Sequence, residues 1–174
     1  MTKIEFSKVK IFGSLLRNVP LLLLLISVLN EFDFNYLGVT FFSFNFSYIL
    51  IFYWSLKKTE SLGYGFIFIA GLINDVIVGF PLGISSFAYL LICGFAAYLR
   101  NITLRPSLIK DGIFFLFTIL FVQSLTHLSL NLFFLFKLDY DILVTNLIFT
   151  FLLYFPFTYL FDAYSKIVFR GLND

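Results

Sequence analysis

The segment 71–83, GLINDVIVGFPLG, joins two apolar runs through a short turn and keeps one carboxylate, Asp75, close to that turn. Pro81 lacks a backbone donor, and Gly79 and Gly83 tolerate the backbone conformations that a sharp reversal needs. The segment therefore predicts two apolar helices that lie side by side and are joined by a tight hairpin turn.

The composition predicts that this hairpin lies in a membrane. Of 174 residues, 60% are hydrophobic and 13% are charged, and the mean hydropathy is +0.98. The surface of a water-soluble domain needs far more polar side chains, so we expect an integral membrane protein. The net charge of +2 gives no indication of nucleic-acid binding. With one cysteine, Cys93, and one histidine, His127, neither a disulfide framework nor a metal site is expected, and no cofactor is indicated.

Apolar runs long enough to cross a hydrocarbon layer of about 30 Å, which takes roughly 20 helical residues, occur six times. The predicted spans are residues 11–29, 39–56, 63–79, 82–99, 113–136 and 142–161. The first has no small-residue cleavage site after it, which favours a retained span over a signal peptide. In the second, residues 44–47 alternate as in a strand, but a lone strand cannot satisfy its backbone in lipid, so a helix is predicted.

The basic residues support this six-span arrangement. An even number of spans places both termini on one side, and eleven of the twelve basic residues lie on that side, with only Lys137 opposite. By the positive-inside rule this side is the cytoplasm. Without the second span, five basic residues would lie inside and seven outside. We therefore predict one all-α transmembrane domain over residues 1–174, with six helices and both termini cytoplasmic.

Asp75 lies on a helix face that it shares with Gly71 and Gly79, because these residues recur at i, i+4 and i+8. The glycines predict close contact between this face and another helix. We expect Asp75, together with Asn74, to accept hydrogen bonds from backbone N–H groups at the start of the fourth span, where the helix dipole favours an anion. The alternative is an ion or proton site in a transporter, since acids within membranes often have that role.

The fifth span carries a second polar face, formed by Gln123, His127 and Asn131 at i, i+4 and i+8. Hydrogen bonds between helices are the first interpretation. A proton relay between His127 and Asp75 is the alternative, although the membrane interior offers no obvious third ionisable group. No nucleophile and base, paired carboxylates or phosphate loop is indicated by spacing, so a non-enzyme is predicted.

The run from Tyr53 to Asn101 resembles the central part of the MreD family of bacterial rod shape-determining membrane proteins. The shared features are Tyr53-Trp54 at the end of the second span, the basic turn Lys57-Lys58, Gly71 with Asp75, Gly79 with Leu82-Gly83, and Tyr89. The chain departs from the family at Phe44-Asn45, where relatives commonly have proline before the polar residue. This departure leaves the start of the second helix uncertain.

The resemblance implies a compact six-helix bundle in the bacterial inner membrane, similar to the substrate-binding subunits of energy-coupling-factor vitamin transporters. It also implies a scaffold of the rod complex that works with MreC and, through it, with the MreB filament, the rod glycosyltransferase and the elongation transpeptidase. The candidates for structural or partner contacts are Gly71, Asn74, Asp75, Gly79, Pro81, Gly83, Gln123, His127 and Asn131.

Two other functions stay open at this point. A vitamin-binding transporter subunit would share the fold, but it generally presents an Ala-x-x-x-Ala face on its first span, and residues 11–29 contain no alanine. A small secondary transporter usually has related halves or broken helices with polar groups at mid-depth, and only the fifth span approaches this.

Overall fold

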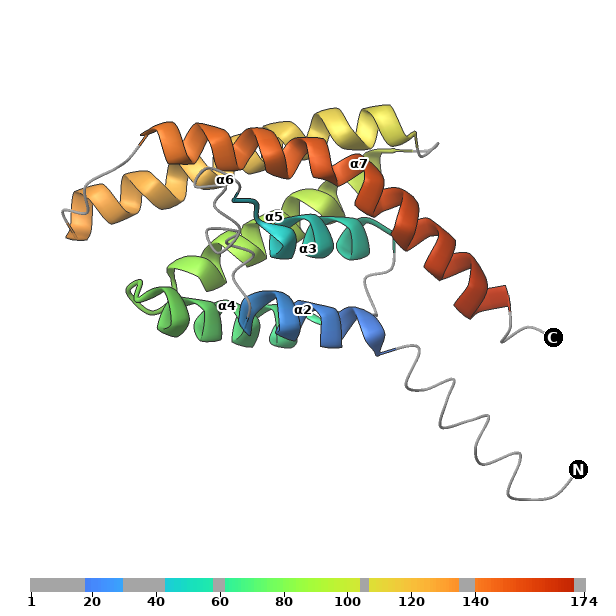
Figure 1. The fold of residues 1–174 in the computed structure, drawn as a ribbon, viewed down its shortest axis with the longest axis horizontal. Coiled ribbons are helices and arrows are strands. Elements are labelled where there is room, and N and C mark those ends of the chain that lie inside the picture. The colour runs from blue at the N-terminus through green and yellow to red at the C-terminus, as the bar shows by residue number, and fades with distance from the viewer. Residues whose placement is uncertain (1–17, 30–42, 58–61, 104–106, 135–139, 171–174) are drawn as a thin grey trace, which may run out of the picture.

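The computed structural model describes residues 18–29, 43–57, 62–103, 107–134 and 140–170. These residues contain six α-helices, which are α2 (Val19–Leu29), α3 (Phe46–Lys57), α4 (Tyr64–Val78), α5 (Ile84–Ile102), α6 (Leu108–Phe134) and α7 (Tyr140–Arg170). The helices form three layers, with α2 beside α4, α3 beside α5, and α6 beside α7 (Figure 1). The middle layer contacts both outer layers, so α3 and α5 form the centre of the bundle.

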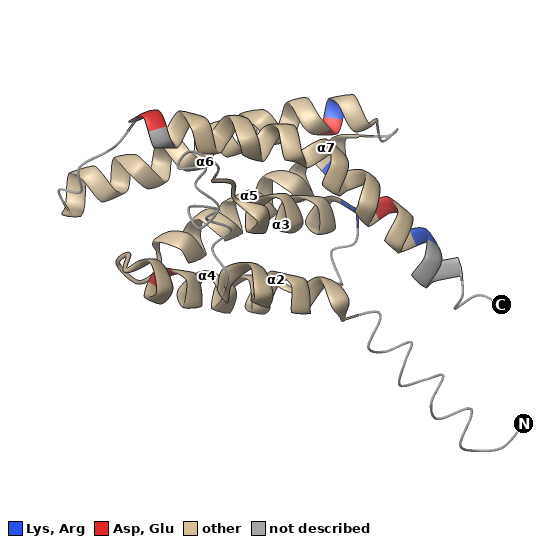
Figure 2. Ribbon diagram, in the orientation of Figure 1, with Lys and Arg blue, Asp and Glu red and all other residues tan. Residues whose placement is uncertain are grey.

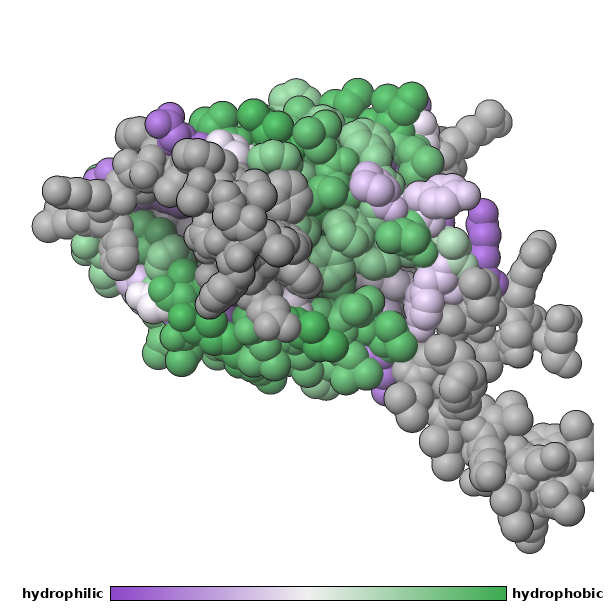
Figure 3. Space-filling model, viewed as in Figure 1, coloured by the Kyte–Doolittle hydropathy of each residue, from purple (hydrophilic) through white to green (hydrophobic). Residues whose placement is uncertain are grey.

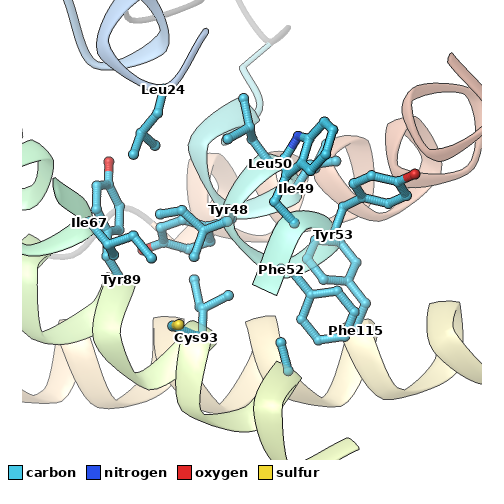
Figure 4. Close-up of a cluster of buried hydrophobic side chains, with 14 of the residues drawn as sticks. Leu24, Tyr48, Ile49, Leu50, Phe52, Tyr53, Ile67, Tyr89, Cys93 and Phe115 are labelled. Carbon is cyan, nitrogen blue, oxygen red and sulfur yellow. The ribbon is translucent and has the colours of Figure 1, made fainter. Parts of the chain in front are cut away.

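The core is built around α3, in which every residue from Phe46 to Leu56 is buried. A helix that is apolar on all sides has no face to offer to water and is stable only inside a larger structure. Figure 4 shows side chains from the surrounding helices meeting those of α3, among them Leu24 of α2, Ile67 of α4 and Phe115 of α6. The core is therefore one continuous cluster of residues from all six described helices.

The start of α3 differs from the predicted second span. The helix begins at Phe46, residues 43–45 are not helical, and residues 39–42 lie outside the described part of the chain. The prediction of one helix through the Phe44-Asn45 pair was therefore wrong. Non-helical backbone inside a membrane requires partners from the protein, and here the N–H of Asn45 donates to Thr150 Oγ1 of α7 over 2.9 Å.

The other helices follow the predicted spans more closely where they are described; α2 agrees with the first span over Val19–Leu29, and residues 11–17 of that span lie outside the described part of the chain. α4 and α5 end within a few residues of the predicted limits, whereas α6 begins at Leu108 rather than Ile113 and α7 continues past Phe161 to Arg170. The predicted spans were limited by charged residues, which interrupt an apolar run, whereas both helices continue through these residues. Asp111, in the first turn of α6, is compatible with helix because the N-terminal end of the helix dipole favours an anion.

α7 is the longest helix, with 31 residues, and Pro156 lies inside it. Proline lacks the N–H that would bond to the carbonyl four residues earlier, and this is a common cause of helix bending. The axis of α7 changes direction partway along its length (Figure 1). The second half of α7 is thereby turned away from α6.

The described surface is largely apolar (Figure 3). Large side chains such as Val76, Phe117 and Phe133 are 70%, 66% and 77% exposed. Two segments, Leu108–Phe134 and Leu143–Lys166, are long and apolar enough to cross a membrane, while Val19–Leu29 and Tyr64–Val78 are apolar but shorter. The arrangement of six membrane-spanning helices stays a prediction.

Candidate functional site

The turn between α4 and α5 fixes Asp75 at one end of the bundle. Gly79 (φ 76°) and Gly83 (φ 104°) adopt left-handed conformations, which glycine accepts without the penalty of a Cβ. Asp75 is fully buried, and its Oδ2 and Oδ1 accept hydrogen bonds from the N–H groups of Gly83 (2.7 Å) and Ser85 (2.8 Å). These are the hydrogen bonds expected of Asp75 at the start of the fourth span, whereas Asn74, which was expected to accept there as well, instead donates through Nδ2 to a side chain, Ser85 Oγ. They satisfy two donors that the first turn of α5 leaves without helical partners.

Gly71 brings α4 and α5 into backbone contact. A Cβ added at Gly71 would lie 2.3 Å from Ser86 Cα and 2.6 Å from Ser86 N. Beside this contact, Ser86 Oγ donates to the Phe68 carbonyl over 3.0 Å, and Asn74 Nδ2 donates to Ser85 Oγ over 3.0 Å. The predicted close helix contact is confirmed at Gly71. It does not hold at Gly79, which is exposed, ends α4 in a left-handed conformation and would have nothing within 4 Å of an added Cβ. Because this face packs within the bundle, Gly71 is not available to a partner protein.

A second polar cluster links α7 to the start of α3 and to α6. Its central residue is Asn146, whose Oδ1 accepts hydrogen bonds from Asn45 Nδ2 (2.8 Å) and Gln123 Nε2 (3.1 Å). Asn146 Nδ2 donates to Ser43 Oγ over 2.7 Å. The Asn45 backbone bond to Thr150 lies beside this group. Together these bonds hold the non-helical residues 43–45 against α7.

The two clusters border a cavity of about 310 Å³. It is lined by the last turns of α2 and α4, the first turns of α3, α5 and α7, and the second half of α6. The polar lining residues are Ser27, Ser43, Asn45, Ser47, Tyr48, Asn74, Ser85, Tyr89, Gln123, Thr126, His127 and Asn146. The apolar ones are Phe44, Phe46, Val78, Phe80 and Leu143. Within the described wall there is no Asp, Glu, Lys or Arg, so the cavity combines uncharged hydrogen-bonding groups with aromatic surface.

The predicted polar face of the fifth span is divided by the structure. Gln123 is buried and bonds to Asn146, as expected for contact between helices. His127 lines the cavity, and its Nδ1 is buried with no hydrogen-bond partner among the described residues. Asn131 is exposed, so the interpretation of all three residues as interhelical contacts does not hold for it.

The structure gives Asp75 and His127 different surroundings. The Asp75 carboxylate is bonded to the backbone of the α4–α5 turn and is not among the residues that line the cavity. In the described part of the chain, no group of three His, Cys, Asp or Glu side chains could hold a metal ion. The geometry therefore provides a helix cap and a neutral cavity as two separate features.

The opposite end of the bundle carries the basic residues of the described chain. Lys57, Arg100, Lys110 and Lys166 lie at the ends of α3, α5, α6 and α7 that gather there (Figure 2). Lys57 Nζ lies 3.8 Å from Asp162 Oδ1, and Tyr53 Oη donates to the same oxygen over 2.6 Å. The structure thus brings together basic residues that the positive-inside rule assigned to one side.

Sequence reasoning missed Asn146, Thr150 and Asp162. A signal for the first two was present, because an Asn and a Thr at i and i+4 form a polar pair on one face of an otherwise apolar span. For Asp162 the signal was weaker, since it follows the predicted end of the last span.

Residues 13–164 match the family model of the rod shape-determining protein MreD. No curated protein and no solved structure matches the chain significantly. The family match extends far beyond residues 53–101, on which the resemblance was first recognised.

Proposed function

Because this chain belongs to the MreD family of rod shape-determining proteins, we propose that it is a non-enzymatic scaffold in the complex that inserts peptidoglycan along the side wall of a rod-shaped bacterium. A role in determining rod shape follows from the family. The proposed partners are MreC and, through it, the MreB filament, the rod glycosyltransferase and the elongation transpeptidase. The observation that carries this proposal is the match over residues 13–164.

The scaffold would act through helix faces that meet other membrane proteins, because the loops between the predicted spans are short. The Gly71 face is used within the bundle, so partner contacts must lie elsewhere. Gly65 of α4 and Gly94 of α5 are exposed, and a Cβ at either position would meet nothing within 4 Å. Small residues on an exposed helix surface allow a partner helix to approach closely.

We also propose a single six-helix domain in the inner membrane with both termini in the cytoplasm. In a Cys93→Ser background, cysteines at Lys110 and Ser165 should react with an impermeant thiol reagent only after the inner membrane is opened. Cysteines at Leu82 and Asp141, at the other end of the bundle, should react in cells whose outer layer alone is permeable. All four positions lie at least partly at the surface. Labelling of Lys110→Cys from outside would contradict this topology.

Depletion of the protein should round or widen the cells and spare septal division, because side-wall insertion fails while division uses other proteins. We expect the tagged chain to co-purify with MreC in mild detergent. If the partner helix contacts Gly65 or Gly94, a leucine at the contacted position should reduce MreC recovery at least about tenfold. A tenfold loss of affinity corresponds to ~1.4 kcal/mol of binding free energy. Melting of that variant should be unchanged, because both positions have open space around them.

A small-molecule-binding subunit of a membrane transporter is the second candidate, and the neutral cavity between the helices is the observation that favours it. The two functions predict different phenotypes. Normal cell width after depletion, together with growth that comes to depend on an added vitamin, would favour the transporter subunit over the scaffold.

A further inference from the structure

We propose that the cavity at the end of the bundle, which all six described helices line, is a binding site for an uncharged small molecule that contains a ring and several hydrogen-bonding groups. This site would stand whether or not the chain is a scaffold, since it rests on the walls of the cavity alone. Its volume, about 310 Å³, equals that of about ten waters in the liquid. A molecule the size of one sugar ring therefore fits, and the volume is at the lower end of known ligand pockets.

The part of the wall that the structure describes favours an uncharged ligand by its chemistry. The described wall contains no Asp, Glu, Lys or Arg side chain that could pair with an ion. An ion placed there would lose its hydration and gain only neutral partners, which is unfavourable inside a membrane protein. The carboxylate of Asp75, the residue after the lining residue Asn74, is already bonded to the N–H groups of Gly83 and Ser85. The preference for an uncharged ligand follows.

The same wall offers several hydrogen-bonding groups that the bundle itself does not use. His127 Nδ1 has no partner among the described residues although it is buried. Asn74 donates one amide hydrogen to Ser85, and Gln123 donates one to Asn146. Each of these amides has a capacity of about four hydrogen bonds. These groups come from α4 and α6, on different sides of the cavity, so they can hold one molecule from more than one direction.

Aromatic side chains distinguish this cavity from a simple water-filled gap. Tyr48 and Tyr89 lie with their ring centroids 5.9 Å apart, and both line the cavity together with Phe44 and Phe80. Flat apolar walls of this kind favour a ring that can pack against them, while waters would leave that surface without a partner. A ring with hydroxyl or amide groups at its edge would satisfy both kinds of wall.

The first measurement is native mass spectrometry of the full-length chain released from lipid nanodiscs. The second is its thermal transition in the presence of N-acetylglucosamine, adenine or glucuronate, each at about 10 mM, which is tenfold above a millimolar Kd. We expect a co-purifying neutral mass of a few hundred daltons at most, or a saturable rise of the melting temperature with a neutral ring probe. Glucuronate, the charged probe, should have no effect.

Variants separate binding from folding. His127→Leu and Thr126→Val remove polar atoms from the cavity wall without breaking a hydrogen bond found within the described bundle. Both should fold, melt at or above the wild-type temperature, and lose at least about tenfold in ligand affinity, the effect of one hydrogen bond to a buried partner. Ser124→Ala, on the exposed side of the same helix, is the matched control and should bind normally. Absence of any co-purifying small mass, together with a melting temperature that neither neutral probe changes, would overturn the proposal in favour of a hydrated cavity.

Discussion

Replacing Gly71 by leucine should prevent α4 from packing on α5 and should leave little folded protein. The new Cβ would lie 2.3 Å from Ser86 Cα and 2.6 Å from Ser86 N, which are backbone atoms that no side-chain rotation can move away. The helices would have to separate, and the separation would also strain the hydrogen bonds from Asp75 to the start of α5. Overpacking usually costs about 1–3 kcal/mol, and we expect more than about 3 kcal/mol here because the obstacle is backbone.

Gly65→Leu is the matched control for this experiment. It lies in the same helix, is exposed, and has no neighbour within 4 Å of its added Cβ. Fluorescence-detected size exclusion in detergent should show a monodisperse peak for Gly65→Leu and aggregation or loss for Gly71→Leu. Equal melting temperatures for the two variants would show that the contact between Gly71 and Ser86 is not present in the folded protein.

The second large effect is expected at Asp75. Asp75→Leu removes the acceptor of the buried Ser85 N–H and of the half-buried Gly83 N–H. Since hydrogen bonds to charged groups contribute about 1.5–3 kcal/mol each, the loss of two should be about 3–6 kcal/mol. Asp75→Asn keeps one acceptor oxygen and should lose roughly half of that, retaining much of the folded protein and its function. Thermal melting in detergent measures both variants.

Val76→Leu serves as the control for Asp75, because Val76 is the next residue and is 70% exposed. Its melting temperature should match that of the wild type. The result for Asp75→Asn distinguishes a capping role of Asp75 from a charge-dependent one. If Asp75→Asn melts like the wild type but abolishes function completely, a capping role does not explain the residue.

The helix cap could be predicted from sequence because all of its parts are close together along the chain. Asp75 accepts hydrogen bonds from the N–H groups of Gly83 and Ser85, which lie only eight and ten residues after it in the chain. A tight turn fixes the distance between residues this close, and the start of a helix always leaves donors without helical partners. The gathering of basic residues at one end could also be predicted from the sequence, since it follows from their positions between the apolar runs and does not depend on three-dimensional packing.

The second polar cluster could not be predicted in the same way. Asn45 meets Asn146 and Thr150 across separations of 101 and 105 residues. Helical periodicity shows which residues share a face but not which other helix that face meets. For the same reason the face of Gln123, His127 and Asn131 was treated as one surface, whereas the structure places its members in a helix contact, at a cavity and on the outside.

The position of α3 at the centre of the bundle has a consequence for biosynthesis. α3 precedes α5 and α7 in the chain, yet both of these helices cover it, and the backbone before it needs Thr150 of α7. With 12 residues it extends only about 18 Å, which is short for a hydrocarbon layer of about 30 Å. A newly made α3 would therefore have no stable place in the lipid until the last helix arrives. Final packing should wait for the end of synthesis, so in a chain truncated before α7 the other apolar helices should insert into the membrane while α3 remains sensitive to protease.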